Sequence, residues 1–130
     1  YLLFFFANGK CAKIDASAYE TKTNRKKLIK AYSDKSELVA VYHTIDDQLF
    51  RLTTTNGKIL LLHSSMISAK STKDSQGVQV MTLRKNHHLS AVVPSDGSEF
   101  VNAKRYLAKS IPAAGALLAA EDAGEQVSLL

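Results

Sequence analysis

Cysteine, proline, glycine and tryptophan are all scarce in this chain of 130 residues, which has one Cys, two Pro, six Gly and no Trp. A single cysteine excludes an internal disulfide framework and suits a reducing compartment. Cys11 directly follows a predicted turn in an apolar segment, so we expect a small core residue and not a nucleophile. The composition, 45% hydrophobic and 22% charged, is ordinary for a globular domain.

Long apolar runs are absent as well. The first residues, YLLFFFANGKC, could pass for the core of a signal peptide, but they lack a basic start and have only six apolar residues. Signal peptides need roughly 7–15, and a membrane span needs about 18. We therefore expect no targeting or membrane segment. The chain starts at Tyr1 and not at a Met, so we expect it to be a piece of a longer protein.

The sequence also lacks the motifs GxxxxGK[ST], GxGxxG and HExxH, so no phosphate loop, dinucleotide fingerprint or zincin helix is predicted. His87 and His88 are adjacent, and neighbouring side chains of a strand point to opposite faces. With His43 and His63 they are expected to be polar loop residues and not metal ligands. No pair of carboxylates stands out, so no catalytic residue, metal or cofactor is predicted in this chain.

An internal repeat is the strongest positive signal. Asn8-Gly9-Lys10 recurs as Asn56-Gly57-Lys58 at an offset of 48, each copy between two apolar runs, and Leu38–Val41 matches Leu89–Val92 at an offset of 51. A repeat of about 50 residues indicates stacked supersecondary units. We therefore divide the chain into two repeats, 1–46 and 47–94, followed by an extension and tail, 95–130.

The repeats are predicted to be all-β. Asn-Gly between apolar runs favours a hairpin with a type I′ turn, in which both central residues have φ > 0. The first hairpin shows no alternation, so both its faces should be covered, whereas the second alternates and should have one wet face. Gly77 should mark a close backbone approach or a bulge. The predicted strands are 1–7, 10–14, 37–44, 48–55, 58–63, 77–83 and 88–93. Residues 28–32 take in the first repeat the place of 77–83 in the second, which gives about four strands per repeat.

Beyond Pro94 the pattern fails. Residues 99–109 fit either a short strand or a helix, and Pro112 to Gly115 should interrupt the structure. Residues 116–120 are expected to form one helical turn, and residues 121–130 to be a frayed, irregular tail.

Basic residues concentrate in the repeats. Residues 1–94 carry 14 Lys and Arg against 7 Asp and Glu, whereas residues 95–130 carry 3 against 5. Each repeat has a Lys-rich loop in an equivalent place, 20–27 and 68–76, which should emerge on the same side. Such lysines either contact a phosphate backbone or form a solvated surface. The predicted DNA-binding residues are Lys22, Arg25, Lys26, Lys27, Lys30, Lys70, Lys73, Arg84 and Lys85.

A hairpin with Asn-Gly-Lys, a polar loop, Gly-Val-x-Val-Met-x-Leu and then Leu-x-Ala-Val resembles the C-terminal repeat of bacterial type IIA topoisomerase A subunits. These are the A subunits of DNA gyrase and topoisomerase IV. The resemblance covers roughly residues 1–94, and SIPAAGALLAAEDAGEQVSLL resembles the extreme C-terminus of such subunits. The resemblance of the repeats is clearest at residues 49–62, 77–83 and 89–93, and a weaker copy lies at 2–14, 28–32 and 38–41.

The resemblance implies a partial β-pinwheel, a propeller-like disc whose blades exchange strands and whose basic rim binds and bends duplex DNA. It implies a non-catalytic module of a cytoplasmic, nucleoid-associated topoisomerase. The cleavage tyrosine and the use of ATP and Mg²⁺ would belong to other regions, with the rest of the A subunit and the ATPase B subunit as partners. Neither loop has gyrase's basic box, of the form QRRGGKG, which favours a topoisomerase IV-like role. A basic all-β module that binds RNA or protein is the alternative.

Overall fold

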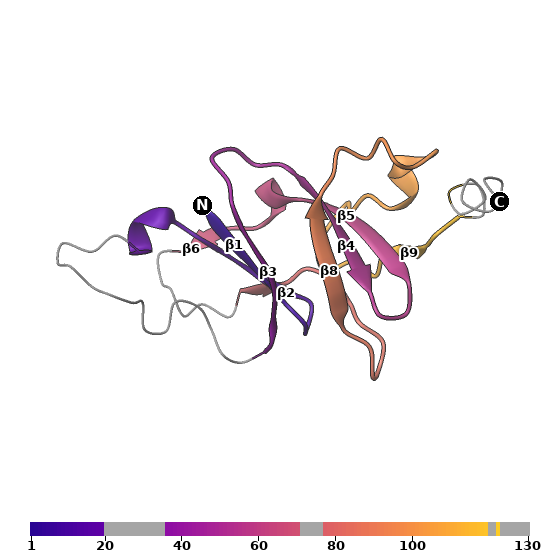
Figure 1. Cartoon of the computed structure of the whole chain (residues 1–130), viewed down its shortest axis with the longest axis horizontal. Helices are drawn as coiled ribbons and strands as arrows, with labels where there is room; N and C mark the ends of the chain where they lie inside the picture. Colours follow the sequence, from indigo (N-terminus) through magenta and orange to yellow (C-terminus); the bar gives the residue numbers. More distant parts are fainter. Residues whose placement is uncertain (20–35, 71–76, 120–121, 123–130) are drawn as a thin grey trace.

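Two β-sheets packed against each other form the fold in the computed structural model, which describes residues 1–19, 36–70, 77–119 and 122. Figure 1 shows the first sheet on the left and the second on the right. The first has the order β3-β1-β2-β6, with β7 also paired to β2, and the second has the order β8-β4-β5-β9. The strands are β1 (Leu2–Phe6), β2 (Lys10–Ile14), β3 (Leu38–His43), β4 (Leu49–Thr54), β5 (Lys58–His63), β6 (Ala69–Lys70), β7 (Val78–Gln79), β8 (Leu89–Pro94) and β9 (Ala116–Leu117).

Side chains from facing strands fill the space between the sheets. The rings of Phe5 on β1 and Phe50 on β4 pack in a tilted arrangement at a centroid distance of 5.5 Å, and the Tyr42 ring on β3 lies 5.1 Å from that of Phe50. The Tyr42 hydroxyl donates a hydrogen bond to the Val92 carbonyl on β8. The remaining members of this core are aliphatic side chains and Cys11. Pairs of aromatic rings at these separations add stability beyond their buried area, so they hold the two sheets in register.

The outward face is buried on the first hairpin and along β5 of the second sheet. Phe4, Phe6 and Ile14 form a second buried cluster on the first sheet, which confirms that both faces of the first hairpin are covered. In β4 the buried Phe50 and Leu52 alternate with partly exposed residues, as predicted, whereas β5 is buried on both faces, so the wet face predicted for the second hairpin is limited to β4. A third cluster joins β5 to the extension through Ile59, Leu61, Phe100 and Tyr106.

The glycines of the two hairpin turns have the predicted positive φ, but the turns are not of the predicted type. Gly9 and Gly57 both have φ of 82°, whereas Asn8 and Asn56 do not have positive φ, so the predicted type I′ turns are wrong. The Gly9 N–H donates to the Phe6 carbonyl at 3.0 Å, and the Gly57 N–H makes the same bond to Thr54. This is a three-residue loop in which only the last residue is left-handed. Asn8 has a different role, accepting a hydrogen bond from the Lys10 N–H.

Strand exchange joins the two repeats, because β6 and β7 belong to the second repeat but pair with β2 of the first. Of the predicted strand 77–83, β7 joins the first sheet with Cys11 opposite Val78, and Met81 forms an isolated parallel bridge with Ala113 of the extension. β6 pairs with β2 in parallel. Gly77 allows this crossing: its φ is 80°, and a Cβ there would lie 2.2 Å from the Cys11 carbonyl oxygen. The close approach predicted at Gly77 is confirmed.

The extension also differs from its prediction. The helical turn predicted for 116–120 is wrong over its described residues, 116–119, because Ala116 and Leu117 are strand β9, paired antiparallel with Ile59 and Lys58. Residues 99–109 contain a short 3-10 turn, η3 (Ala103–Arg105), which resembles η1 (Ala16–Tyr19) and η2 (Ser64–Met66). In the predicted tail the structure describes Asp122, whose carboxylate accepts hydrogen bonds from Tyr106 and Val101. In the described part of the chain no helix is long and apolar enough to cross a membrane.

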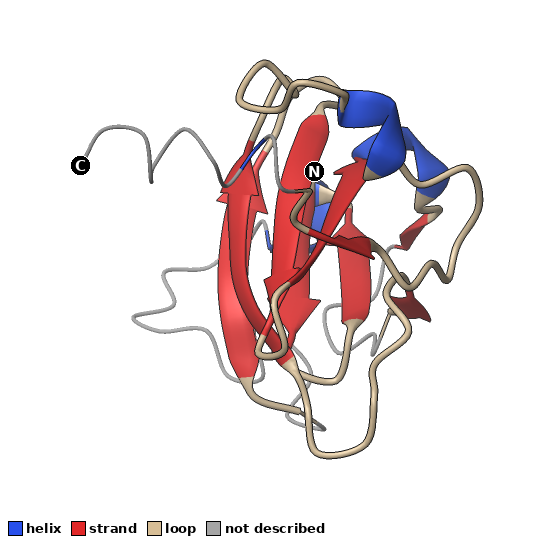
Figure 2. Ribbon diagram, turned by 90° about the vertical axis from the view of Figure 1, so that its right-hand side faces the viewer, coloured by secondary structure: helices blue, strands red, loops and turns tan. Residues whose placement is uncertain are grey.

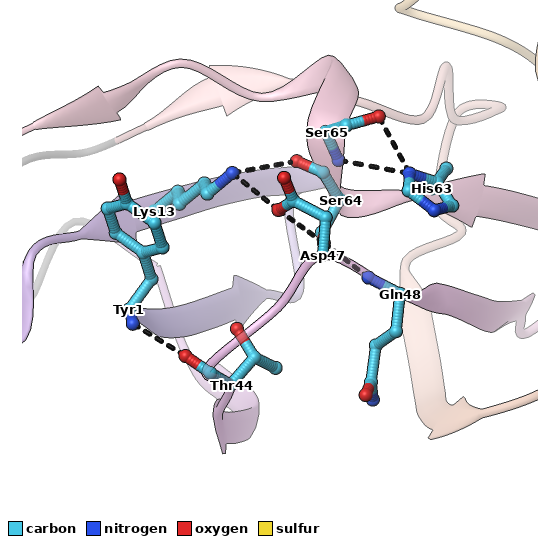
Figure 3. A network of polar contacts seen from close by, with 8 residues as sticks. All are labelled: Tyr1, Lys13, Thr44, Asp47, Gln48, His63, Ser64 and Ser65. Atoms are coloured by element: carbon cyan, nitrogen blue, oxygen red, sulfur yellow. Dashed lines mark hydrogen bonds and ion pairs between the residues drawn. The ribbon is translucent and has the colours of Figure 1, made fainter.

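A partly buried ion pair links the two sheets (Figure 3). The Lys13 ammonium on β2 lies 2.6 Å from the Asp47 carboxylate, which precedes β4, and it also donates to the Ser64 carbonyl after β5. The Ser64 hydroxyl donates to Asp47 at 2.9 Å and accepts from the Gln48 N–H. Only 6% of the Lys13 side chain is exposed, against 34% for Asp47, so this lysine belongs to the interior.

Candidate nucleic-acid interface

Three turns meet at one end of the two sheets, which we call the turn end. They are the hairpin turn before Lys10, the hairpin turn before Lys58, and the loop from Arg84 to His88 between β7 and β8. The Leu89 N–H donates to the Ala7 carbonyl at 2.9 Å, which ties the loop to the first hairpin. Figure 2 shows the strands side by side, with hairpin loops at the lower end and 3-10 turns at the upper end.

Hydrogen bonds fix the Arg84–His88 loop against the second hairpin. The Thr55 N–H donates to the His88 carbonyl at 2.9 Å, and the His88 N–H donates to the Thr55 hydroxyl at 3.1 Å. The Thr55 hydroxyl also lies 2.9 Å from His87 Nδ1. A left-handed Asn86 (φ 66°) lets the loop reverse tightly, and the His87 N–H closes it onto the Arg84 carbonyl. The loop is therefore held in place by its backbone, while its side chains stay exposed.

The turn end is basic. Arg84 and Lys85 are exposed, and Lys10 and Lys58 follow the two turn glycines and are partly exposed. Glu37, just before β3, is an exposed acidic residue at this end. Cations clustered at one end can neutralise several phosphates of a polyanion together.

The opposite end of the sheets is acidic. An open depression there is lined by residues that include Gln48, Ser95, Asp96 and Glu99. Hydrogen bonds from Ser98 lower the pKa of Asp96 below its ordinary value, so its carboxylate stays charged. Asp15, Asp46 and Asp47 follow strands that end on this side. Among the residues that the structure describes, acidic side chains thus gather at this end, where Lys13 and Lys70 also lie, whereas the turn end is mainly basic.

The structure separates the basic residues that the sequence predicted together. Arg84 and Lys85 lie at the turn end, but Lys70 ends β6 opposite Ile14, at the acidic end. The other predicted residues, Lys22, Arg25, Lys26, Lys27, Lys30 and Lys73, lie outside the described residues, as do most of the two Lys-rich loops. Lys10 and Lys58 were missed by the sequence reasoning, although they are the third residue of the repeated Asn-Gly-Lys motif.

The structure offers little for catalysis among the residues it describes. No group of three or more His, Cys, Asp and Glu side chains there could hold a metal ion. Cys11 is fully buried, as predicted, and burial raises the pKa of its thiol well above the usual range, partly offset by the positive charge of Lys13. A thiol that stays protonated is a poor nucleophile. The arrangement suits binding by charge.

No family model and no curated protein matches the sequence. Solved structures do. The C-terminal domain of DNA topoisomerase IV superposes with a TM-score of 0.73 and 21% identity, over 90% of this chain and 40% of that one. The chain has the β-pinwheel fold found in the C-terminal domains of type IIA topoisomerase A subunits.

Two further β-pinwheel structures are similar. The C-terminal domain of DNA gyrase A gives a TM-score of 0.67 at 17% identity, covering 88% of this chain and 42% of that one. The E. coli ParC C-terminal domain gives 0.56 at 14% identity, covering 73% and 39%. This chain therefore spans about two fifths of the structures it matches. The partial, all-β pinwheel predicted from the sequence is confirmed.

Proposed function

We propose that this chain is a DNA-binding module of a bacterial type IIA topoisomerase A subunit, and that its turn end contacts the backbone of duplex DNA. The observation that carries the proposal is the cluster of exposed and partly exposed cations at the turn end of a β-pinwheel. Lys10, Lys58, Arg84 and Lys85 stand at one end, and Asp46, Asp96 and Glu99 at the other. Contacts to phosphates position a protein on DNA without reading sequence, so binding should be insensitive to base composition.

Catalysis and energy use belong to the rest of the proposed parent complex. The parent would be an ATP-dependent type IIA topoisomerase that acts in the cytoplasm on the nucleoid, with the ATPase B subunit as partner. ATP and Mg²⁺ would bind through other regions, and this chain by itself should bend DNA without cleaving it. The predicted residues outside the described part of the chain, Lys22 to Lys30 and Lys73, remain candidates for further phosphate contacts.

The test compares two variants with the same change in net charge. Arg84→Ala/Lys85→Ala removes two cations from the turn end, and Lys104→Ala/Lys109→Ala removes two exposed cations from the extension. Binding to a labelled duplex is measured by fluorescence anisotropy at several salt concentrations. The first variant should lower the salt slope by about 0.9 for each phosphate interaction that is removed, and equally for all sequences. The second should change it much less.

Two outcomes would overturn this assignment. One is duplex binding no stronger than that of a neutral protein at low salt, and the other is an equal effect of the two variants. A preference for single-stranded RNA over the duplex would favour the alternative, a basic all-β module that binds RNA. A third variant, Lys22→Ala/Arg25→Ala/Lys26→Ala/Lys27→Ala, tests the first Lys-rich loop in the same assay.

A further inference from the structure

Backbone hydrogen bonds hold part of the extension firmly at two points. The Ala108 N–H donates to the Leu61 carbonyl on β5 at 2.9 Å, and Ala108 belongs to the core between the sheets. Further along, the Ala113 N–H donates to the Val80 carbonyl at 3.1 Å, and the Thr82 N–H donates to the Ala113 carbonyl at 2.9 Å. The segment between these points is therefore fixed, and a surface that it forms is already shaped before a ligand arrives.

A groove of about 360 Å³ lies along this fixed segment, and we call it the extension groove. It is lined by residues with apolar and polar side chains, among them Leu60, Ala108, Ala113, Arg105, Lys109 and Ser110. The last three of these are exposed. The volume is near the lower limit of the roughly 300–1,000 Å³ of ligand pockets, so the groove suits a few side chains of a peptide.

Exposed apolar side chains accompany the cations here. Leu107 lines the groove and is 43% exposed, and Leu117 on β9 is 56% exposed. The Arg105 guanidinium donates to the Leu117 carbonyl from Nε and Nη2, both at 3.4 Å, which places its charge beside this leucine. These contacts use two of the five guanidinium donors, so the others can bind an anion. Open apolar side chains next to arginine are typical of protein-binding surfaces.

This surface has an excess of positive charge. Lys104, Arg105 and Lys109 are exposed. Asp122 interacts electrostatically with Arg105, but its carboxylate is already hydrogen-bonded to the Tyr106 hydroxyl. Among the described residues around the groove, cations therefore outnumber acidic groups, and a ligand with several carboxylates would complement them.

The extension groove differs from the turn end in what surrounds its cations. At the turn end, the loop from Arg84 to His88 is polar and exposed throughout. At the groove, Arg105 and Lys109 accompany two exposed leucines. A DNA backbone carries charge but has no side chain that would cover these leucines, whereas a peptide can supply both carboxylates and an apolar side chain.

We propose that the extension groove binds an acidic peptide segment of a partner protein, in which carboxylates flank an apolar residue. The apolar residue packs against Leu107, while the carboxylates pair with Arg105 and Lys109. The planar guanidinium of Arg105 suits a carboxylate better than an isolated point charge would. This inference does not depend on nucleic-acid binding, because it concerns the extension and not the turn end.

The probe for the test is the fluorescein-labelled peptide GEDLDEG, and its binding to the full chain is followed by anisotropy. The peptide GEDSDEG has the same charge without the apolar side chain, so it separates binding in the groove from simple attraction of charge. In the protein, Arg105→Ala/Lys109→Ala removes two cations from the groove. Arg84→Ala/Lys85→Ala is the matched control, because it removes two exposed cations from the turn end.

The wild type should bind GEDLDEG about tenfold more tightly than GEDSDEG, because only the leucine buries apolar surface. Arg105→Ala/Lys109→Ala should weaken the binding of GEDLDEG about tenfold, since two charge-assisted contacts are lost. Arg84→Ala/Lys85→Ala should change it by less than about twofold at physiological salt, where distant charges are screened. An excess of unlabelled duplex DNA should leave the peptide bound.

Four outcomes would overturn the proposal: no binding of GEDLDEG to the wild type, equal binding of the two peptides, an equal effect of the two double variants, or displacement of the peptide by duplex DNA. The last would assign the groove to nucleic acid. Circular dichroism checks that the variants are folded, and the comparison of the two peptides on the wild type needs no variant. Because DNA affinity is measured separately, failure of peptide binding leaves the proposed contact at the turn end unaffected.

Discussion

The ion pair between Lys13 and Asp47 gives a stability prediction in which the result depends on which partner is removed. Asp47→Asn leaves an ammonium group that is 6% exposed without a countercharge. Removing one partner of a fully buried pair costs about 3–5 kcal/mol. Because 34% of the Asp47 side chain is exposed, water screens part of this effect, and we expect a loss of about 2 kcal/mol.

Removing the lysine should be milder. Asp47 without its partner keeps its bond from the Ser64 hydroxyl and its access to water. The second repeat has Leu61 at the position of Lys13, fully buried, so a leucine suits this site of the fold. Lys13→Leu should therefore cost no more than about 1 kcal/mol, and Lys13→Leu/Asp47→Asn should be more stable than Asp47→Asn alone.

Urea and thermal unfolding, followed by circular dichroism at pH 7, measure these differences. A loss of about 2 kcal/mol corresponds to a decrease in Tm of roughly 8 °C for a chain of this size. Hydrogen bonds from Lys13 and Ser64 lower the pKa of Asp47. The stability that the ionised Asp47 adds to the folded state is therefore complete above the unfolded pKa of about 3.9. It is lost as the pH falls through the lower pKa of the folded state. The unfolding free energies of the wild type and Asp47→Asn should therefore converge at that low pH. An Asp47→Asn chain as stable as the wild type at pH 7 would refute the reasoning.

Two further predictions concern the turns and one concerns the core. Gly57→Val should cost more than about 1 kcal/mol of unfolding free energy, because a β-branched residue fits φ of 82° poorly, and an unchanged Tm would contradict the turn assignment. Gly9→Ala should cost more than Gly57→Ala at the same φ, because its Cβ would lie 2.5 Å from the Met81 carbonyl oxygen; equal losses in urea unfolding would speak against this contact. Cys11 should react with iodoacetamide at pH 8 only after unfolding in urea, because burial raises the pKa of its thiol, and fast labelling of the native chain would disprove its burial.

The hairpins could be predicted from the sequence because their determinants are local. Apolar runs on either side of Asn-Gly specify two strands and a reversal within one short stretch of chain, and β2 and β5 have the predicted bounds. The turn type was wrong because Gly alone takes the left-handed conformation here. Asn8 is used to accept the Lys10 N–H, which is an Asx interaction that competes with a type I′ geometry.

Strand exchange could be predicted only in part because its determinants are distant in the chain. Gly77 gave a signal, but its partner Cys11 lies in the other repeat, and nothing in the local sequence identifies which strand the glycine will approach. Residues 116–120, ALLAA, have high helix propensity, which favoured a helical turn. So short a segment cannot stabilise an isolated helix, whereas the edge of β5 offers backbone partners at once, so tertiary pairing overrides propensity.

The end of the fold at which a charged residue lies depends on its position relative to the turns. The number of charges in each segment of the sequence does not predict it. Each hairpin reverses at its glycine, so residues directly after Gly9 and Gly57 lie at the turn end, and residues that follow β2 or β5 lie at the other. Lys10 and Lys58 thus share an end although they belong to different repeats. Lys70 and Arg84 are much closer in the sequence, yet parallel pairing of β6 with β2 sends them to opposite ends. The register of the strands, and not the density of lysine, therefore selects which cations can face one phosphate backbone.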